Sequence, residues 1–253
     1  MSQFCTFIHL ENNVFDKDLS SMEPYQRDNI LHFLIYFCRH WTHIILLPLY
    51  AIRKGLYNMA IGAAAGSISW VALIAYGITM NPIFTIWFFI IPGIVTAFAL
   101  MFGNFSEHIF VHPDIATMPQ NLKSYQYNCA LSMQMMSDGY NQTSFNNGYH
   151  VTHHINSRIH WHDMPSHFMN NLEKYAENNA VVFQGIDVFG IGFNVFIGRW
   201  DLLADHYVHL TKEKRSREEV IKDLKCRVTP IQRSNRLISA EEADNDGDMK
   251  KSN

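Results

Sequence analysis

The amino-acid sequence predicts an all-α membrane protein with two transmembrane helices, interfacial amphipathic helices and a helical cap on the cytosolic side. The main observation is a stretch of 52 residues, Gly55 to Ser106, that contains no Asp, Glu, Lys, Arg or His. A helix needs about 20 apolar residues to cross a bilayer, so this stretch is long enough for two spans and a tight turn. Charged residues gather at both ends of the chain, and the mean hydropathy of the whole is therefore only −0.08.

The composition excludes a purely soluble protein, a disordered chain and a disulfide scaffold. Apolar residues make up 48% and charged residues 17% of the 253 residues. The four cysteines are widely spaced and form no C-x-x-C pair, which indicates free thiols in a reducing compartment; they are Cys5, Cys38, Cys129 and Cys226. The net charge of −3 gives no reason to expect a nucleic-acid partner, and we expect none.

The turn between the two spans is expected at Asn81-Pro82. Proline cannot continue a helix, and it pushes the residue before it into extended geometry. We therefore expect spans at about residues 57–79 and 82–102.

A third apolar stretch, residues 30–52, is open to two interpretations, a third span or two half-length segments. It is interrupted by Arg39, His40 and His43. A central arginine costs at least about 2.5 kcal/mol on insertion scales, so we favour half-length segments that lie in the interface, with these side chains among the headgroups. The basic pair Arg53-Lys54 then marks the cytosolic start of the first span, and two crossings return the chain to the same side.

Beyond the spans the sequence predicts a chain that is helical in outline and does not cross the membrane. A cap at Asp163 predicts a helix over residues 163–178. Residues 181–198 are apolar but hold polar residues and four glycines, and we expect them to lie along the interface. Ser216 and Glu219 form a capping box that opens a short exposed helix.

Histidine is the most informative residue type, because six of the 14 histidines fall within residues 150–167. His150, His153 and His154 have helical spacing, and positions i, i+3 and i+4 lie within an arc of about 100°. Three imidazoles on one face could point at one locus and supply much of the ligand shell of a divalent iron. The alternative is a polar histidine cluster on a helix surface that binds no metal.

A second group of polar residues follows the second span. Asn104, His108 and His112 are spaced by four residues and share one stripe if the helix continues, and a helix that leaves the bilayer is a rigid mount for ligands. Pro113 makes His112 a poor candidate ligand. The residues around His9 form no metal-binding pattern, and by itself it would be interpreted as a surface residue. The motifs of zinc proteases, serine hydrolases and nucleotide-binding loops are absent from the sequence.

Taken together, these residues resemble the membrane-bound fatty acid desaturases, eukaryotic diiron enzymes with histidine boxes. Gly148-Tyr149-His150-x-x-His153-His154 is similar to the third box, and Asn104-x-x-x-His108 at the end of a span is similar to the block before it. Further similarity comes from Glu11-Asn12-Asn13, Asp18-Leu19-Ser20-Ser21, Tyr25-Gln26-Arg27-Asp28, His160-Trp161 and Met164-Pro165, so that the resemblance covers roughly residues 6 to 210.

The resemblance implies a diiron centre at the cytosolic face of the endoplasmic reticulum, where O2 is activated to remove hydrogens from a fatty acyl chain. Electrons would come from a cytochrome b5-type donor through the basic cytosolic face. The metal ligands that it implies are His150, His153, His154, His108, His9 and, through a water, Asn104. Glu107 or Asp163 could orient these rings from behind.

The first box and most of the second are missing from this sequence, and where the second box ends in a His-His pair the chain has His9-Leu10. We therefore interpret residues 1–29 as a remnant of the second-box region, 30–210 as a desaturase-like membrane domain, and 211–253 as a basic cytosolic helix with a disordered tail. The final Lys250-Lys251-Ser252-Asn253 matches a dilysine signal for return to the endoplasmic reticulum.

Two functions are expected from these observations. The first is an oxidoreductase of lipid metabolism that desaturates, or hydroxylates, fatty acyl chains at an iron centre. The second is a non-catalytic or incomplete desaturase-like membrane protein. Five candidate histidines are too few to hold two irons tightly, so we expect about one equivalent of metal or less, and no acyl turnover until the missing boxes are restored.

Overall fold

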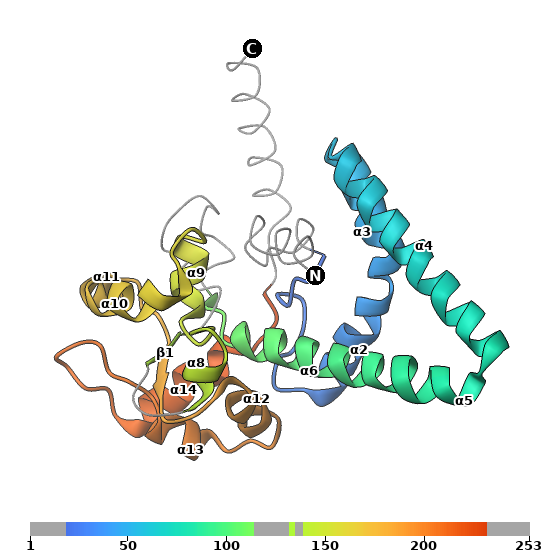
Figure 1. Cartoon of the computed structure of the whole chain (residues 1–253). Coiled ribbons are helices and arrows are strands. Elements are labelled where there is room, and N and C mark those ends of the chain that lie inside the picture. Colours follow the sequence, from blue (N-terminus) through green and yellow to red (C-terminus); the bar gives the residue numbers. More distant parts are fainter. Residues whose placement is uncertain (1–18, 114–131, 135–138, 232–253) are drawn as a thin grey trace, which may run out of the picture.

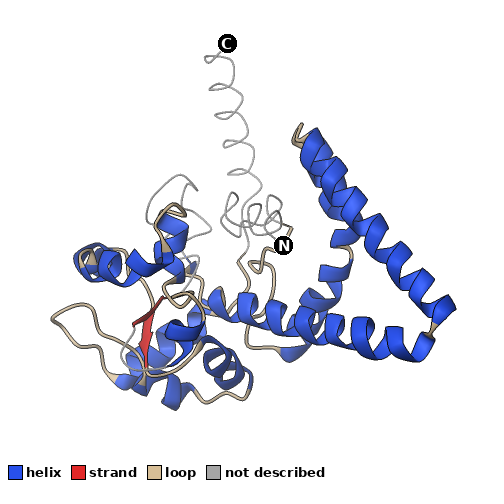
Figure 2. Cartoon of the chain, in the orientation of Figure 1, coloured by secondary structure: helices blue, strands red, loops and turns tan. Residues whose placement is uncertain are grey.

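The structure, a computed structural model, describes residues 19–113, 132–134 and 139–231. It is mainly helical, as the sequence predicts (Figures 1 and 2). The membrane part consists of α2 (Ile30–Trp41), α3 (His43–Arg53), α4 (Tyr57–Met80), α5 (Pro82–Thr85), the π-helical turn η1 (Ile86–Ile90) and α6 (Ile91–Glu107). The cap consists of α8 (Gly139–Thr143), α9 (His150–Ile155), η3 (Trp161–Asp163), α10 (Met164–Met169), α11 (Leu172–Glu177), α12 (Val188–Phe196), α13 (Trp200–Asp205) and α14 (Arg217–Arg227).

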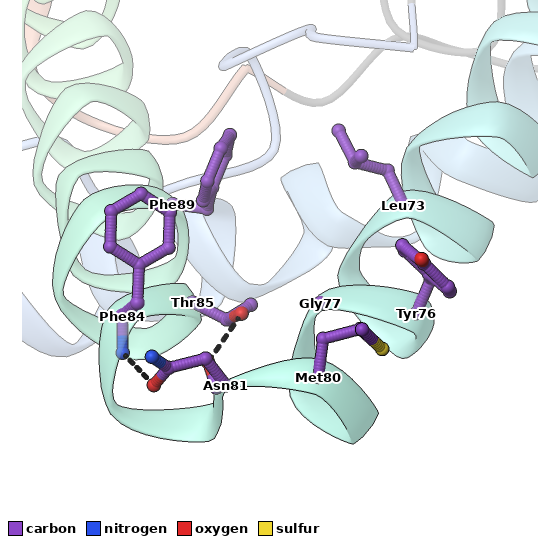
Figure 3. Close-up of a pocket in the computed structure, with 8 residues that line it drawn as sticks. All are labelled: Leu73, Tyr76, Gly77, Met80, Asn81, Phe84, Thr85 and Phe89. Atoms are coloured by element: carbon purple, nitrogen blue, oxygen red, sulfur yellow. Dashed lines mark hydrogen bonds between the residues drawn. The ribbon is translucent and has the colours of Figure 1, made fainter.

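The two expected spans are confirmed as long apolar helices, Tyr57–Met80 and Pro82–Glu107. Asn81 ends the first and caps the second, because its side chain accepts a hydrogen bond from the backbone N–H of Phe84 at 3.1 Å (Figure 3). The second helix runs five residues beyond the expected end at 102. The helix contains a π-helical turn at Ile86–Ile90, in which the backbone N–H of Ile91 bonds to the carbonyl of Ile86. This turn accommodates Pro92, which follows it and has no backbone N–H to donate.

The stretch of residues 30–52 forms two helices, α2 and α3, that meet at a bend of 68°. Each has 12 residues or fewer and is too short to cross a bilayer alone, which requires about 20. Thr42 at the bend donates its hydroxyl hydrogen to the carbonyl of Arg39 at 2.6 Å. The break is compatible with both interpretations, half-length interfacial segments and one broken span, so the interfacial placement stays a prediction.

The cap departs from the expected single helix over 163–178. Met164–Met169 and Leu172–Glu177 are separate helices, and Asp163 makes no side-chain cap bond. Asn171, in the gap, donates its side-chain amide to the carbonyl of His167 at 2.8 Å. Side chains that bond to nearby backbone in this way compete with helix continuation, which is why the helix ends here.

Residues 181–198, which we expect to lie along the interface, contain both a strand and a helix. They form the strand β2 (Val182–Gln184), a turn at Gly185 with φ of +74°, and then α12. β2 pairs in parallel with β1 (Ser132–Gln134), with Ser132 opposite Val182. The capping box of Ser216 and Glu219 at the start of α14 is confirmed. That helix is only partly exposed, because it buries Val220 and Leu224 in the main core.

The main core joins the end of α6 to the segment before α2 and to α12, α13 and α14. At its centre lies a charged side chain, Arg27, which is fully buried. Burial lowers its pKa to about 10, against the opposite effects of Glu23 and Asp28, so the guanidinium remains protonated at neutral pH. It donates to six backbone carbonyls, those of Met22, Glu23, Tyr25, Ile109, Arg227 and Thr229.

We predict that Arg27→Lys lowers the free energy of unfolding by about 2–4 kcal/mol. The lysine ammonium cannot reach carbonyls on every side, and each buried carbonyl left without a partner costs about 1–3 kcal/mol. The measurement is the midpoint of chemical unfolding in detergent. Arg199→Lys is the control, because Arg199 lies in an exposed pair with Asp201 and should change stability by less than about 0.5 kcal/mol. Equal midpoints for the two variants would show that the six carbonyls do not require the guanidinium.

A second prediction concerns the close approach of α12 to α6. A Cβ added at Gly192 would overlap Ser106 Oγ and stand 3.1 Å from Phe102 Cζ, so Gly192→Ala should destabilise the fold by about 1–3 kcal/mol through overpacking. Gly103→Ala is the matched control, because its Cβ would meet Phe189 Cζ at an ordinary 3.7 Å. The comparison uses the same unfolding midpoint, and a Gly192→Ala midpoint at or above that of Gly103→Ala contradicts the packing argument.

Candidate metal centre

Three buried histidines converge where α6 ends against α9. His108 directly follows α6, and His150 and His154 lie on α9. The Nε2 atom of His150 is 3.0 Å from Nε2 of His108 and 3.2 Å from Nε2 of His154. Each side chain is less than a tenth exposed. Among the His, Cys, Asp and Glu side chains of the described residues, this histidine trio forms a group close enough together to hold a metal ion.

The spacing of these nitrogens fits a single metal ion. For an ion bound to nitrogen at about 2.1 Å, neighbouring ligands of an octahedron stand about 3.0 Å apart, which is close to the two separations found here. Neutral imidazole nitrogens are ligands that suit divalent iron as well as zinc and copper. The donor set therefore fits the iron that the sequence resemblance implies, and three donors leave coordination positions open for other ligands.

The short helix α9 is held in place from both sides. On one side Thr152 shares a hydrogen bond of 2.6 Å with the hydroxyl of Tyr175, and both side chains are buried. On the other side the loop before α9 is closed by Asn141, whose side-chain oxygen accepts from Gly148 N–H at 2.8 Å. These contacts fix a helix of six residues that is too short to be stable alone.

The third expected ligand on α9, His153, is not brought into the trio. Its ring centroid lies 6.2 Å from that of His150 and 6.4 Å from that of His154, and partial burial lowers its pKa below the ordinary value. On a helix, residues i+3 and i+4 lie on opposite sides of residue i, separated by about 100°. His108 stands on the His154 side, with ring centroids 5.0 Å apart, and His153 is not among the three histidines that converge.

His112 does not share a helical stripe with Asn104 and His108, whereas the backbone N–H of His108 still bonds to the carbonyl of Asn104 at 3.3 Å. The helix ends at Glu107, and His108 already has non-helical backbone angles, so His112 lies outside the helix that was expected to carry it. Asn104, in the last turn of α6, donates its side-chain amide to the hydroxyl of Tyr36 on α2 at 2.7 Å. His9 lies outside the described residues.

The remaining histidines of the dense segment stay apart from the trio. His160 and His162 are exposed around η3, and His162 lies 3.3 Å from Asp163. Two polar residues near the trio gain importance from the structure. Asn147 donates its amide to Glu107, and Glu107 in turn faces His150. The position of Glu107 next to His108 in the sequence indicated that Glu107 could act on a histidine of the site. No feature of the sequence indicated a role for Asn147.

Comparison with known proteins agrees with this geometry. The family model described as "Fatty acid desaturase" matches residues 12–185, a range that holds both candidate spans and all three histidines of the trio. No curated protein and no solved structure gives a significant match. Because the matched range covers well over half of the 253 residues, the chain belongs to the fatty acid desaturase family.

Proposed function

We propose that this protein is an oxidoreductase of lipid metabolism that uses O2 to desaturate fatty acyl chains, with iron held by His108, His150 and His154. The observation that carries the proposal is the convergence of three buried Nε2 atoms at the end of a membrane helix. Iron bound there would supply the redox chemistry that breaks unactivated C–H bonds. The protein supplies the histidine ligands and a dry surround, and α6 connects the centre to the lipid phase.

The number of ligands supports a second candidate function, a non-catalytic desaturase-like protein that binds at most one metal. The described residues bring three imidazoles together, enough for one ion and too few for two. His9, His153 and, through a water, Asn104 stay proposals as further iron ligands, and the ring centroid of His153 lies 6.2 Å from that of His150.

The acyl substrate is proposed from the family and from an apolar cavity in the membrane part. The cavity has a volume of about 510 Å³ and lies between α2, α4 and the π-helical part of the second span. Its walls are apolar or aromatic, formed by Phe37, Trp41, Trp70, Ile74, Phe89, Ile90, Gly93 and Ile94. A smaller cavity of about 200 Å³ lies at the turn between the spans, where Leu73 and Phe89 face one another (Figure 3). The mainly apolar walls of the larger cavity suit hydrocarbon.

We place the cap at the cytosolic surface of the endoplasmic reticulum membrane. Phe189, Phe193 and Ile197 form an exposed apolar stripe at helical spacing on α12. Phe189 packs beside Phe102, five residues before the second span ends, and a span of 26 residues is about 39 Å long, more than the ~30 Å of a hydrocarbon core. The stripe therefore reaches the boundary between acyl chains and headgroups.

An electron donor of the cytochrome b5 type is proposed to approach the cap from the aqueous side. Exposed basic residues on and before α14 would face an acidic donor; they are Lys212, Lys214, Lys222 and Lys225.

Metal analysis tests the proposed centre. We predict that detergent-purified protein holds about one equivalent of metal or less, and that His108→Ala and His150→Ala remove most of it, because each deletes one of three converging nitrogens. A His153→Ala, His154→Ala double variant should lose metal as well. His162→Ala is the control and should retain the wild-type content, because its ring is exposed and outside the trio.

Three results would contradict this assignment. Two tightly bound irons in the wild type would show that further residues bind metal. A metal content unchanged by His150→Ala would exclude the trio as the metal site. A metal content unchanged by the double variant would exclude the third histidine box as a metal site. Expression in a host of known acyl composition then separates the two functions. New double bonds that disappear with His150→Ala support desaturation, whereas metal binding with unchanged acyl chains supports the alternative.

The placement of α12 gives a further prediction. A spin label on Phe193→Cys, with the four native cysteines replaced by serine, should be accessible to O2 and shielded from a water-soluble nickel complex, because the stripe faces lipid. The same label on Glu218→Cys of α14 should show the reverse pattern, since that residue is exposed on the cap. Equal nickel accessibility at the two sites would refute the interfacial placement.

A further inference from the structure

Behind the histidine trio lies a buried carboxylate that the metal site does not itself use. Glu107 is the last residue of α6 and is only 6% exposed. Its Oε2 atom is 3.5 Å from Nδ1 of His150, and its Oε1 atom accepts a hydrogen bond from the side-chain amide of Asn147. The carboxylate thus faces the side of the His150 ring that is turned away from the trio.

The chemistry of imidazole gives this arrangement a purpose. In a neutral histidine one ring nitrogen carries the hydrogen and the other offers a lone pair, and only the lone pair binds a metal. Nε2 of His150 points to His108 and His154, so metal binding requires the hydrogen on Nδ1. An acceptor at Nδ1 favours that tautomer, fixes the ring orientation and makes the ligand more basic.

Asn147 donates a hydrogen bond to the carboxylate of Glu107, and the loop that carries Asn147 is fixed by hydrogen bonds of its own. The backbone N–H of Asn147 donates to the carbonyl of Ser144 at 3.1 Å, and Gly148 is bonded to Asn141. The two residues before Asn147, Phe145 and Asn146, have φ values of +54° and +56°. A bulky side chain rarely adopts such a conformation, so this loop has a specific shape that presents Asn147 to Glu107.

The other acid that the sequence suggested for this task is elsewhere. The Asp163 side chain is 68% exposed and lies beside His162, outside the trio. Of these two acids, Glu107 is the one placed to act on a histidine of the site.

We propose that Glu107, held by Asn147, is a positioning residue that sets the tautomer and orientation of His150 for metal binding. This inference rests on the proposed metal site. It predicts that the pair Asn147 and Glu107 tunes how tightly the trio binds an ion without being among the atoms that touch it.

The test is Co²⁺ binding to metal-free protein in detergent, followed by visible absorption and by competition with a chelator. Glu107→Gln keeps the size of the side chain and removes its carboxylate, and we expect the Co²⁺ affinity to fall about 10- to 100-fold, as is usual for a lost partner of a metal-bound histidine. The absorption bands at saturating Co²⁺ should shift, because the basicity of one ligand changes. Asn147→Ala should weaken binding less than Glu107→Gln, because the carboxylate remains.

Thermal unfolding of the metal-free variants separates positioning from a structural role. Glu107→Gln should unfold at the wild-type temperature or above it, because a buried carboxylate is costly to desolvate. Glu173→Gln, an exposed change on α11, is the control for both measurements. An affinity of Glu107→Gln within about 2-fold of wild type overturns the inference, and so does a loss of affinity matched by a lower unfolding temperature in both Glu107→Gln and Asn147→Ala.

The same experiment keeps the two proposals distinct. Wild type that binds no Co²⁺, like the His108→Ala variant, overturns the metal site and this inference together. Wild type that binds Co²⁺ as tightly as Glu107→Gln leaves the metal site standing and removes the role of Glu107 alone.

Discussion

The fold of the cap depends on Arg27, a charge at the centre of an apolar core. Its guanidinium donates to carbonyls of the segment before α2, to Ile109 just after the first histidine of the trio, and to Arg227 and Thr229 at the end of α14. Backbone bonds run in parallel, from Arg27 to Val228 and from Val111 to Arg227. Three segments that are far apart in the chain are thereby joined at one point. No neutral side chain offers five donors in a fixed plane, which explains why a charge is buried there.

This junction positions the candidate metal centre. His108 directly follows the last residue of α6, and the next residue is Ile109, whose carbonyl accepts a hydrogen bond from Arg27. From the opposite side, α9 is fixed by Thr152 and Tyr175 and by the closed loop before it. The three imidazoles therefore stand on two elements that are each anchored by buried polar contacts. Such anchoring holds the three imidazoles close together without help from a bound ion.

The membrane part and the cap follow different packing rules. The spans expose large apolar side chains such as Ile61 and Val95, because lipid replaces a protein core around them. Where α6 reaches the cap the pattern changes, and Phe105 and Ser106 become fully buried against α12. The small Gly192 permits that contact, while Phe193 and Ile197 of the apolar stripe remain exposed. The candidate metal centre consequently lies where the membrane helix α6 meets the cap.

The sequence alone determined the features that depend on local periodicity. An uncharged stretch broken at Asn81-Pro82 is sufficient for two spans, and the i, i+4 spacing of His150 and His154 places both rings on one side of a turn. Side-chain competition at Asn171 and the strand before α12 were missed, because neither changes the apolar pattern strongly. Only the tertiary structure decided that His108 joins His150 across 42 residues while His153 stays outside the trio, and that Glu107 rather than Asp163 stands behind the site. These are contacts between separate elements, and their geometry is fixed by how those elements pack against one another, which no spacing along the chain encodes.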